Sequence, residues 1–129
     1  MIFVGIDWAE AHHDVTVLDQ AGAALARLRI PDSLDGLRRL HTVVAEHVDD
    51  PEQVIVGIET PTGLLPGALL AAGYALYAIN PKAASRYRER HSISGAKSDA
   101  GDSKMLADLV RTDRHTTGVI SVTPSWPPR

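Results

Sequence analysis

The chain has 129 residues, the size of one domain with a single core. Hydrophobic residues make up 44% and charged residues 22%, a composition that excludes extended disorder. The sequence contains no Cys, which excludes disulfide frameworks, thiolate zinc sites and cysteine nucleophiles. It has no apolar run of roughly 18 residues and no basic amino-terminal leader, so we expect no membrane partner and a cytoplasmic location.

Charge is distributed unevenly along the chain. Residues 1–81 carry four Arg and no Lys against eleven acidic residues, a net charge of −7. Residues 82–114 carry eight basic against five acidic residues, a net charge of +3. A basic segment after an acidic one favours an anionic partner that contacts only one region, although a solvated charged face gives the same pattern.

The first part of the chain has the pattern of three strands and a helix. Apolar alternation predicts strands over residues 2–7, 13–19 and 25–30. Because the links are short, these strands form an antiparallel meander. Ser33 is placed to cap a helix that ends near residue 49. Its apolar face is expected to hold Leu34, Leu37, Leu40, Val44 and Val48.

The rest of the chain alternates between strands and helices. Strands are expected over 53–59 and 74–79, and helices over 64–72, 82–90 and 99–111. Gly73 fits the left-handed position after the first of these helices. Residues 92–98 are predicted to be a polar loop and residues 116–129 a flexible, Pro-rich tail. The order predicts an α/β fold, a mixed sheet with helices on both faces, and resembles that of ribonuclease H-like domains.

Four acidic residues are placed to converge. Asp7 and Glu59 end the first and fourth predicted strands, and parallel neighbours would bring both to the edge where open α/β sheets place ligands. Asp99 and Asp102 stand three apart at the start of a predicted helix, so they face the same side. Four such carboxylates repel one another unless cations fill the cluster, which suits Mg²⁺ or Mn²⁺. Ordinary strand-terminal and helix-capping acids are the alternative.

Basic residues surround the second acidic pair. On the predicted helix over 82–90, Arg86 and Arg90 share a face with Lys82, from which they could contact phosphates. A solvated basic helix is the alternative. The predicted nucleic-acid contacts are Lys82, Arg86, Arg88, Arg90, Lys97 and Lys104.

Two other features near the first strand have simpler explanations. His12 and His13 are adjacent on a strand and point to opposite faces, so they do not bind one metal together and are expected at the surface. Trp8 follows Asp7 and is expected in the core rather than on a stacking platform.

Five segments of the chain carry a resemblance to a known family. They are Gly-Ile-Asp at 5–7, Ile-Glu-Thr-Pro-Thr-Gly at 58–63, Asn-Pro at 80–81, Lys-Ser-Asp-Ala-Gly-Asp at 97–102 and Leu-Ala-Asp-Leu at 106–109. In this order they resemble the amino-terminal RuvC-like domain of DEDD insertion-sequence transposases, the RNA-guided bridge recombinases related to pilin-gene invertases. The Lys-Ser-Asp-x-x-Asp block is the most specific segment, and the resemblance extends from residue 2 to about residue 115.

The resemblance implies a function and a set of partners. Asp7, Glu59, Asp99 and Asp102 match the catalytic metal ligands of the family, with Mg²⁺ or Mn²⁺ as cofactor. DNA and a structured guide RNA are the implied partners, and a homo-oligomer is implied for the full-length protein. The RuvC-like domain would occupy residues 1–115. Family members continue into a domain with a nucleophilic Ser, so we expect this chain to be an isolated or truncated catalytic domain.

Other functions remain as alternatives. A RuvC-like Holliday-junction resolvase would use similar acids with water as the nucleophile, and an inactive nucleic-acid-binding fragment would keep the acids without turnover. Proofreading exonucleases usually carry a second acid two residues after the first, where this chain has Ala9. Sugar kinases and actin-like ATPases need Gly and Thr after the first Asp to hold phosphates, where this chain has Trp8 and Ala9. The sequence therefore favours a transposase domain that performs metal-dependent phosphodiester strand exchange.

Overall fold

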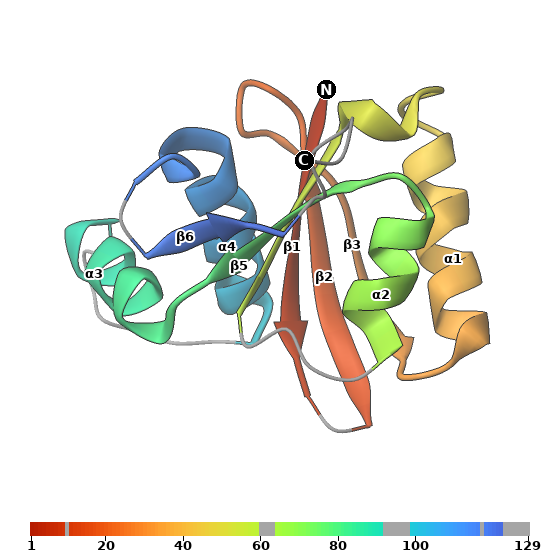
Figure 1. Ribbon diagram of the computed structural model, residues 1–129, viewed down its shortest axis with the longest axis horizontal. Helices are drawn as coiled ribbons and strands as arrows, with labels where there is room; N and C mark the ends of the chain where they lie inside the picture. The colour runs from red at the N-terminus through yellow and green to blue at the C-terminus, as the bar shows by residue number, and fades with distance from the viewer. Residues whose placement is uncertain (10, 60–63, 92–98, 117, 123–129) are drawn as a thin grey trace, which may run out of the picture.

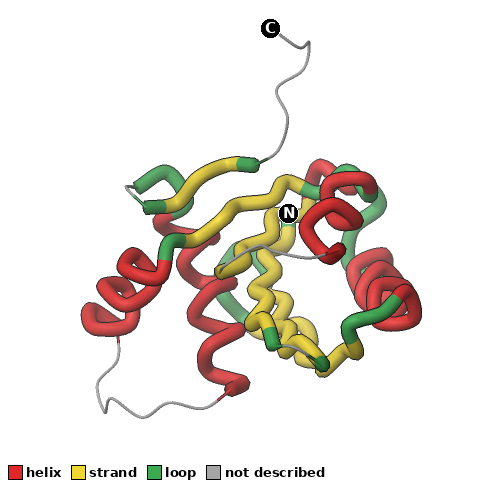
Figure 2. Tube along the Cα trace, turned by 60° about the horizontal axis from the view of Figure 1, so that its bottom comes forward, coloured by secondary structure: helices red, strands yellow, loops and turns green. Residues whose placement is uncertain are grey.

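The protein folds around one mixed sheet. The computed structural model describes residues 1–9, 11–59, 64–91, 99–116 and 118–122. Its strands follow the order β3-β2-β1-β4-β5-β6, with helices on both sides of the sheet (Figures 1 and 2). The strands are β1 (Ile2–Trp8), β2 (His12–Leu18), β3 (Ala24–Pro31), β4 (Val54–Glu59), β5 (Ala75–Ile79) and β6 (Val119–Ser121). The helices are α1 (Leu34–Ala45), the 3₁₀ turn η1 (Pro51–Gln53), α2 (Leu64–Ala71), α3 (Pro81–His91) and α4 (Asp99–Asp113).

Strand directions follow from the lengths of the connections. Few residues separate β1 from β2 and β2 from β3, and both pairs are antiparallel, which confirms the predicted meander. The helical crossovers make β1–β4 and β4–β5 parallel pairs. Helices α1 and α2 cover one face of the sheet, and α3 and α4 cover the other (Figure 1). No helix in the described ranges is long and apolar enough to cross a membrane.

Alternation along the inner strands divides the core in two. Ile6 and Ile58 are fully buried on the side of α1 and α2, together with Leu40 of α1. Phe3 and Ile55 are buried on the side of α3 and α4. Because both faces of β1 and β4 are covered, these strands are apolar almost throughout.

Both predicted helix boundary signals are confirmed. The Ser33 side chain accepts a hydrogen bond from the Gly36 amide at 3.3 Å and caps α1. Gly73 has a φ of +91° after α2. The amides of Gly73 and Tyr74 donate to the carbonyls of Leu70 and Leu69, which is a Schellman motif.

The predicted apolar face of α1 is wrong at its first residue. Leu40 and Val44 are buried, but Leu34 is 72% exposed. Leu34 belongs to the first helical turn and borders an open cavity rather than packing into the core. The helix also ends at Ala45, before the predicted boundary, and Val48 is half-buried beyond it.

Part of the predicted flexible tail is a strand. Val119–Ser121 forms β6, antiparallel to β5, and the Val122 amide donates to the carbonyl of Leu76 at 2.8 Å. Three residues are too few to show a period-two pattern, so only the open edge of β5 reveals this strand. The predicted loop over 92–98 lies outside the described residues.

Candidate active site

The two strand-terminal acids occupy equivalent positions on neighbouring strands. Strands β1 and β4 pair Gly5 with Gly57 and Ile6 with Ile58 in parallel register, so Asp7 and Glu59 come next on each strand. Neighbouring strands lie about 4.8 Å apart, and alternate residues share a face. Since both Ile residues face α1 and α2, both half-buried acids lie on the side of α4. The predicted parallel pairing of these two strands is confirmed.

Helix α4 lies directly on the glycines that precede these acids. A Cβ atom at Gly5 would collide with the Ser103 carbonyl oxygen and the Ala107 amide nitrogen, and one at Gly57 would crowd Val110. The absence of side chains at these two positions therefore lets the backbone of α4 approach β1 and β4.

A buried hydrogen bond fixes the start of α4 to the sheet. The hydroxyl oxygens of Thr16 on β2 and Ser103 are 2.7 Å apart, and both side chains are buried. At the other end of the helix, the Arg114 guanidinium lies 5.5 Å from the centre of the Phe3 ring. The helix thus runs antiparallel to β1, and its first turn lies near the carboxyl ends of β1 and β4 (Figure 1). Asp99 and Asp102 belong to that turn.

The described side chains do not form a metal cluster. Asp102 accepts a hydrogen bond from Arg88 Nη2 at 3.2 Å, and both side chains are less than one-third exposed. No three His, Asp or Glu side chains among the described residues are arranged as a metal site. The side chain of Asp99 lies outside the described part. The four-acid metal site therefore stays a prediction.

Sequence reasoning missed a fifth acid beside Asp7. Asp14 on β2 lies directly opposite Asp7, and Arg29 on β3 lies directly opposite Asp14. Arg29 holds Asp14 with two hydrogen bonds, from Nε at 2.8 Å and from Nη2 at 3.3 Å. Like charges opposite each other destabilise a sheet, so this ion pair offsets the repulsion between Asp14 and Asp7. A polar residue inside the β2 pattern is the signal that could have found it.

Adjacent strands thus contribute one charged residue each to a line across the sheet. We name this set the carboxylate row, and it consists of Arg29, Asp14, Asp7 and Glu59. The row is negative overall because one cation faces three acids.

Half of the predicted nucleic-acid contacts are engaged within the protein. Beyond the Arg88–Asp102 pair, Arg90 pairs with Asp113 at 2.9 Å and Lys104 with Asp108 at 2.7 Å. Lys82 and Arg86 are exposed on α3 and make no ion pair with the described residues. Lys97 lies outside the described residues.

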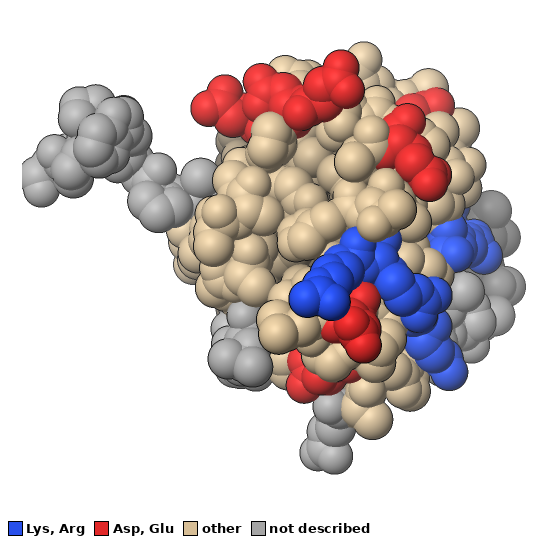
Figure 3. Space-filling model, turned by 90° about the vertical axis from the view of Figure 1, so that its right-hand side faces the viewer, with Lys and Arg blue, Asp and Glu red and all other residues tan. Residues whose placement is uncertain are grey.

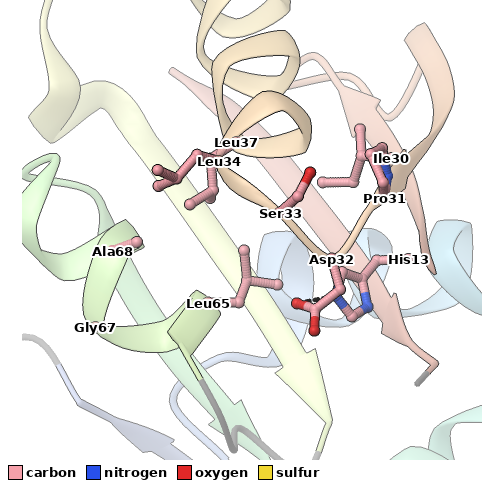
Figure 4. Close-up of a pocket in the computed structure, with 10 residues that line it drawn as sticks. All are labelled: His13, Ile30, Pro31, Asp32, Ser33, Leu34, Leu37, Leu65, Gly67 and Ala68. Carbon is pink, nitrogen blue, oxygen red and sulfur yellow. Dashed lines mark hydrogen bonds and ion pairs between the residues drawn. The ribbon is translucent and has the colours of Figure 1, made fainter. Parts of the chain in front are cut away.

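A separate apolar cavity lies on the opposite side of the sheet. It has a volume of about 440 Å³, and residues of α1 and α2, including Leu37 and Leu65, line it (Figure 4). His13 borders it and is fully buried, so its predicted surface position is wrong. Its Nδ1 accepts the Ala9 amide at 3.2 Å, which leaves Nε2 to donate to Asp32 at 3.1 Å.

The half-buried Trp8 ring confirms the core placement expected for it. It packs against the core cluster that contains Ile6, and its centre lies 4.4 Å from that of the His13 ring. Packing with Trp8 and two hydrogen bonds explain how His13, a polar residue, is buried without an unsatisfied nitrogen.

Known proteins that are similar to this chain are named as transposases or, among solved structures, as RuvC. Over 115 residues, the chain is 50% identical to a protein of Streptomyces coelicolor named as the mini-circle transposase of IS117, with 88% of this chain and 28% of that protein covered. It is 29% identical over 122 residues to a protein of Sinorhizobium fredii named as transposase y4uE, with 93% and 34% covered. The chain therefore spans about a third or less of the length of these relatives.

Solved structures of RuvC show the same fold. Thermus thermophilus RuvC, in complex with a Holliday-junction substrate, superposes with a TM-score of 0.57 at 18% identity, over 95% of this chain and 99% of that one. A second structure of RuvC from this organism gives a TM-score of 0.56 at 21% identity, over 88% and 97%. These similarities confirm the predicted ribonuclease H-like fold of the RuvC type.

The family follows from the match over nearly the whole chain. A family model for the DEDD transposases of IS110 insertion sequences, described as a transposase, matches residues 4–125. The match extends across both parallel strands that end in acids and across α4. The chain belongs to the IS110-type DEDD transposase family.

Proposed function

We propose that this chain is the metal-dependent catalytic domain of a DNA transposase, with Asp7, Glu59, Asp99 and Asp102 as the ligands of Mg²⁺ or Mn²⁺. The observation that carries this proposal is the register of β1 and β4, which makes Asp7 and Glu59 neighbours on the face that α4 covers. The first turn of α4 lies at the same end of these strands (Figure 1).

The donor chemistry fits a hard divalent cation. All four residues offer carboxylate oxygens, the ligands that Mg²⁺ and Mn²⁺ prefer. Asp7 and Glu59 are half-buried, so excess negative charge at this edge is only partly screened by water. When bound, a pair of divalent ions activates the attacking oxygen and stabilises the leaving oxygen of a phosphodiester.

Arg88 forms an ion pair with Asp102, one of the proposed metal ligands. Because the Asp102 carboxylate accepts from Arg88, binding of a cation by Asp102 weakens or replaces this ion pair. The released guanidinium then carries an unpaired positive charge on α3, the helix that also carries Lys82 and Arg86. DNA phosphates are the partner we propose for these three residues and for Lys97, Arg90 and Lys104.

The transposase proposal ranks above a resolvase. The similarity to RuvC concerns the fold, whereas the family match and the relatives at 50% and 29% identity are all transposases. The resemblance to bridge recombinases implies two further partners for the full-length protein. We propose a structured guide RNA as one and a second copy of the protein, in a homo-oligomer, as the other.

Calorimetry of Mn²⁺ binding tests the proposed ligands. We expect saturable binding to the chain that disappears in the double variant Asp99→Asn, Asp102→Asn. The matched control is Asp35→Asn, Asp49→Asn, which removes the same charge from two exposed acids outside the site. Circular dichroism checks that each variant is folded. Absence of binding to the unaltered chain, or equal loss in both double variants, would contradict the proposal.

A further inference from the structure

Strand β3 leaves one of its faces open beside the carboxylate row. Helix α4 packs against β1, β2 and β4. On β3, Leu25, Arg27 and Arg29 are exposed. The residues that alternate with them face the core, since Leu28 is half-buried and Ile30 is fully buried. By register, Arg29 aligns with Asp14 and Asp7, and Arg27 aligns with Thr16 and Gly5. Both arginines therefore lie on the same side of the sheet as the proposed metal ligands.

The two arginines differ in their partners. Arg29 is held by both oxygens of Asp14. Arg27 makes no ion pair or hydrogen bond through its side chain with any described residue. The first 81 residues contain only four basic residues, which are Arg27, Arg29, Arg38 and Arg39. Figure 3 shows basic side chains on the α1 side of the molecule, with acidic side chains beside them and a further acidic group at the top of the view.

A hollow lies between Arg27 and the start of α4. It has a volume of about 220 Å³. Its lining includes Arg27, Arg29 and Asp14 of the meander together with Ser103 of α4. Since Asp14 is already neutralised by Arg29, the uncompensated charge at this hollow is the positive charge of Arg27.

The distance between Arg27 and the carboxylates allows one DNA strand to contact both. Two strand separations of about 4.8 Å place the backbone of β3 roughly 10 Å from that of β1, which carries Asp7. Successive phosphates of duplex DNA advance by about 3.4 Å along the helix axis and also rotate about it, so at most about three nucleotides separate phosphates at these two positions. A guanidinium matches the geometry of a phosphate and stays charged at every relevant pH.

We propose that Arg27 binds the phosphate backbone of the DNA strand on which the carboxylates act, a few nucleotides from the reacting phosphodiester. This inference rests on the proposed function. It adds a contact from the meander, on the side of α4 away from α3, so the bound strand crosses the sheet from α3 to β3. Arg29 keeps Asp14 from repelling that strand.

DNA binding at several salt concentrations tests this contact. The probe is a fluorescent double-stranded DNA, measured by anisotropy with Ca²⁺ in place of Mg²⁺. We expect Arg27→Ala to weaken binding roughly tenfold at 0.1 M salt and to reduce the slope of log K against log salt by about 0.9, the effect of one lost phosphate contact. Arg27→Lys should retain most of that slope.

The control removes the same charge elsewhere. Arg38 is exposed on α1, which covers the opposite face of the sheet, so Arg38→Ala should change affinity little. Equal effects of the two alanine variants, or no effect of Arg27→Ala, would overturn the inference. A larger effect of Arg27→Ala on RNA than on DNA would overturn the assignment to DNA.

The calorimetric test separates this inference from the proposed function. If Mn²⁺ binding fails while Arg27→Ala still weakens DNA binding selectively, the metal site is wrong and the β3 contact stands. If Mn²⁺ binds at the four acids and Arg27→Ala has no effect, the β3 contact is wrong and the metal site stands.

Discussion

At the scale of single residues, the same tripeptide pattern serves β1 and β4. In Gly5-Ile6-Asp7 and Gly57-Ile58-Glu59, the glycine lets α4 approach the sheet. The isoleucine fills the core on the opposite face, and the acid reaches the edge of the sheet. Packing and proposed chemistry are thus encoded within three consecutive residues, because successive side chains alternate between the two faces.

Replacing Gly5 tests the close approach of α4. Gly5→Ala places a methyl group against the backbone of Ser103 and Ala107, which cannot rotate away. We expect the free energy of unfolding in urea to fall by about 3 kcal/mol or more, the upper range of overpacking effects.

The control for this substitution is a glycine with open space around it. Gly67 in α2 has open space where a Cβ atom would stand, so Gly67→Ala should leave stability unchanged or raise it by up to about 1 kcal/mol. A Gly5→Ala protein as stable as the unaltered chain would show that α4 does not rest on β1 as described.

At the scale of elements, polar pairs join helices to strands across the core. Thr16 and Ser103 join β2 to α4. On the other face, His41 Nδ1 and the Tyr74 hydroxyl are 2.6 Å apart and join α1 to the residue that precedes β5. Burial lowers the pKa of His41 and raises the pKa of Tyr74. Both directions favour a neutral imidazole that accepts a hydrogen bond from a protonated phenol.

This pair predicts a pH dependence of stability. The pKa of His41 in the folded state lies below the unfolded value of 6.5. The contribution of neutral His41 to the free energy of unfolding is therefore complete above pH 6.5. It is lost as the pH falls from that value through the lower pKa of the folded state. We expect the free energy of unfolding to decrease between pH 7.5 and 5.5 more in the unaltered chain than in His41→Gln. Identical pH dependence in both proteins would contradict the role of His41.

At the scale of the whole molecule, the sheet extends across the predicted domain boundary. Strand β6 pairs with β5 and the Asn80 amide donates to the Gly118 carbonyl at 2.8 Å, so residues after 115 complete one edge of the sheet. The opposite edge is β3, where Arg27 and Arg29 add charge that discourages pairing with other chains.

Shortening the chain tests whether β6 belongs to the folded unit. A chain that ends at His115 lacks β6, whereas one that ends at Val122 retains it. We expect the shorter chain to be less stable by about 2 kcal/mol, the value of a few lost backbone hydrogen bonds. It should also associate more readily in sedimentation experiments, because the edge of β5 becomes open. Equal stability of the two chains would support a unit that ends near residue 115.

The sequence predicts the fold well where patterns are long and poorly where a single contact decides. In the part of the chain that the structure describes, the meander, the parallel strands β4 and β5 and the four α-helices follow from alternation, capping and Gly73. Leu34, His13 and β6 are mispredicted because a cavity, two hydrogen bonds and an open strand edge decide their environments. The shared edge of Asp7 and Glu59 follows from strand order.

Two ion pairs near the candidate site could not be predicted. The ion pairs Arg88–Asp102 and Arg29–Asp14 form only when segments that are separate in the sequence pack together. Sequence alone assigns Arg88 to DNA contact and gives Asp14 no role, because charge composition does not specify which acid each arginine meets.

Paramagnetic broadening by Mn²⁺ in an amide NMR spectrum locates the bound ion and so decides whether the proposed metal site exists. We predict that substoichiometric Mn²⁺ broadens the amide signals around Asp7, Glu59 and the first turn of α4. The exposed acids Asp49, Asp50 and Glu52, near η1, serve as an internal reference for non-specific binding and should broaden only at higher concentrations. Broadening that begins at those reference acids, or spreads evenly over the surface, would contradict a metal site at the carboxyl ends of β1 and β4.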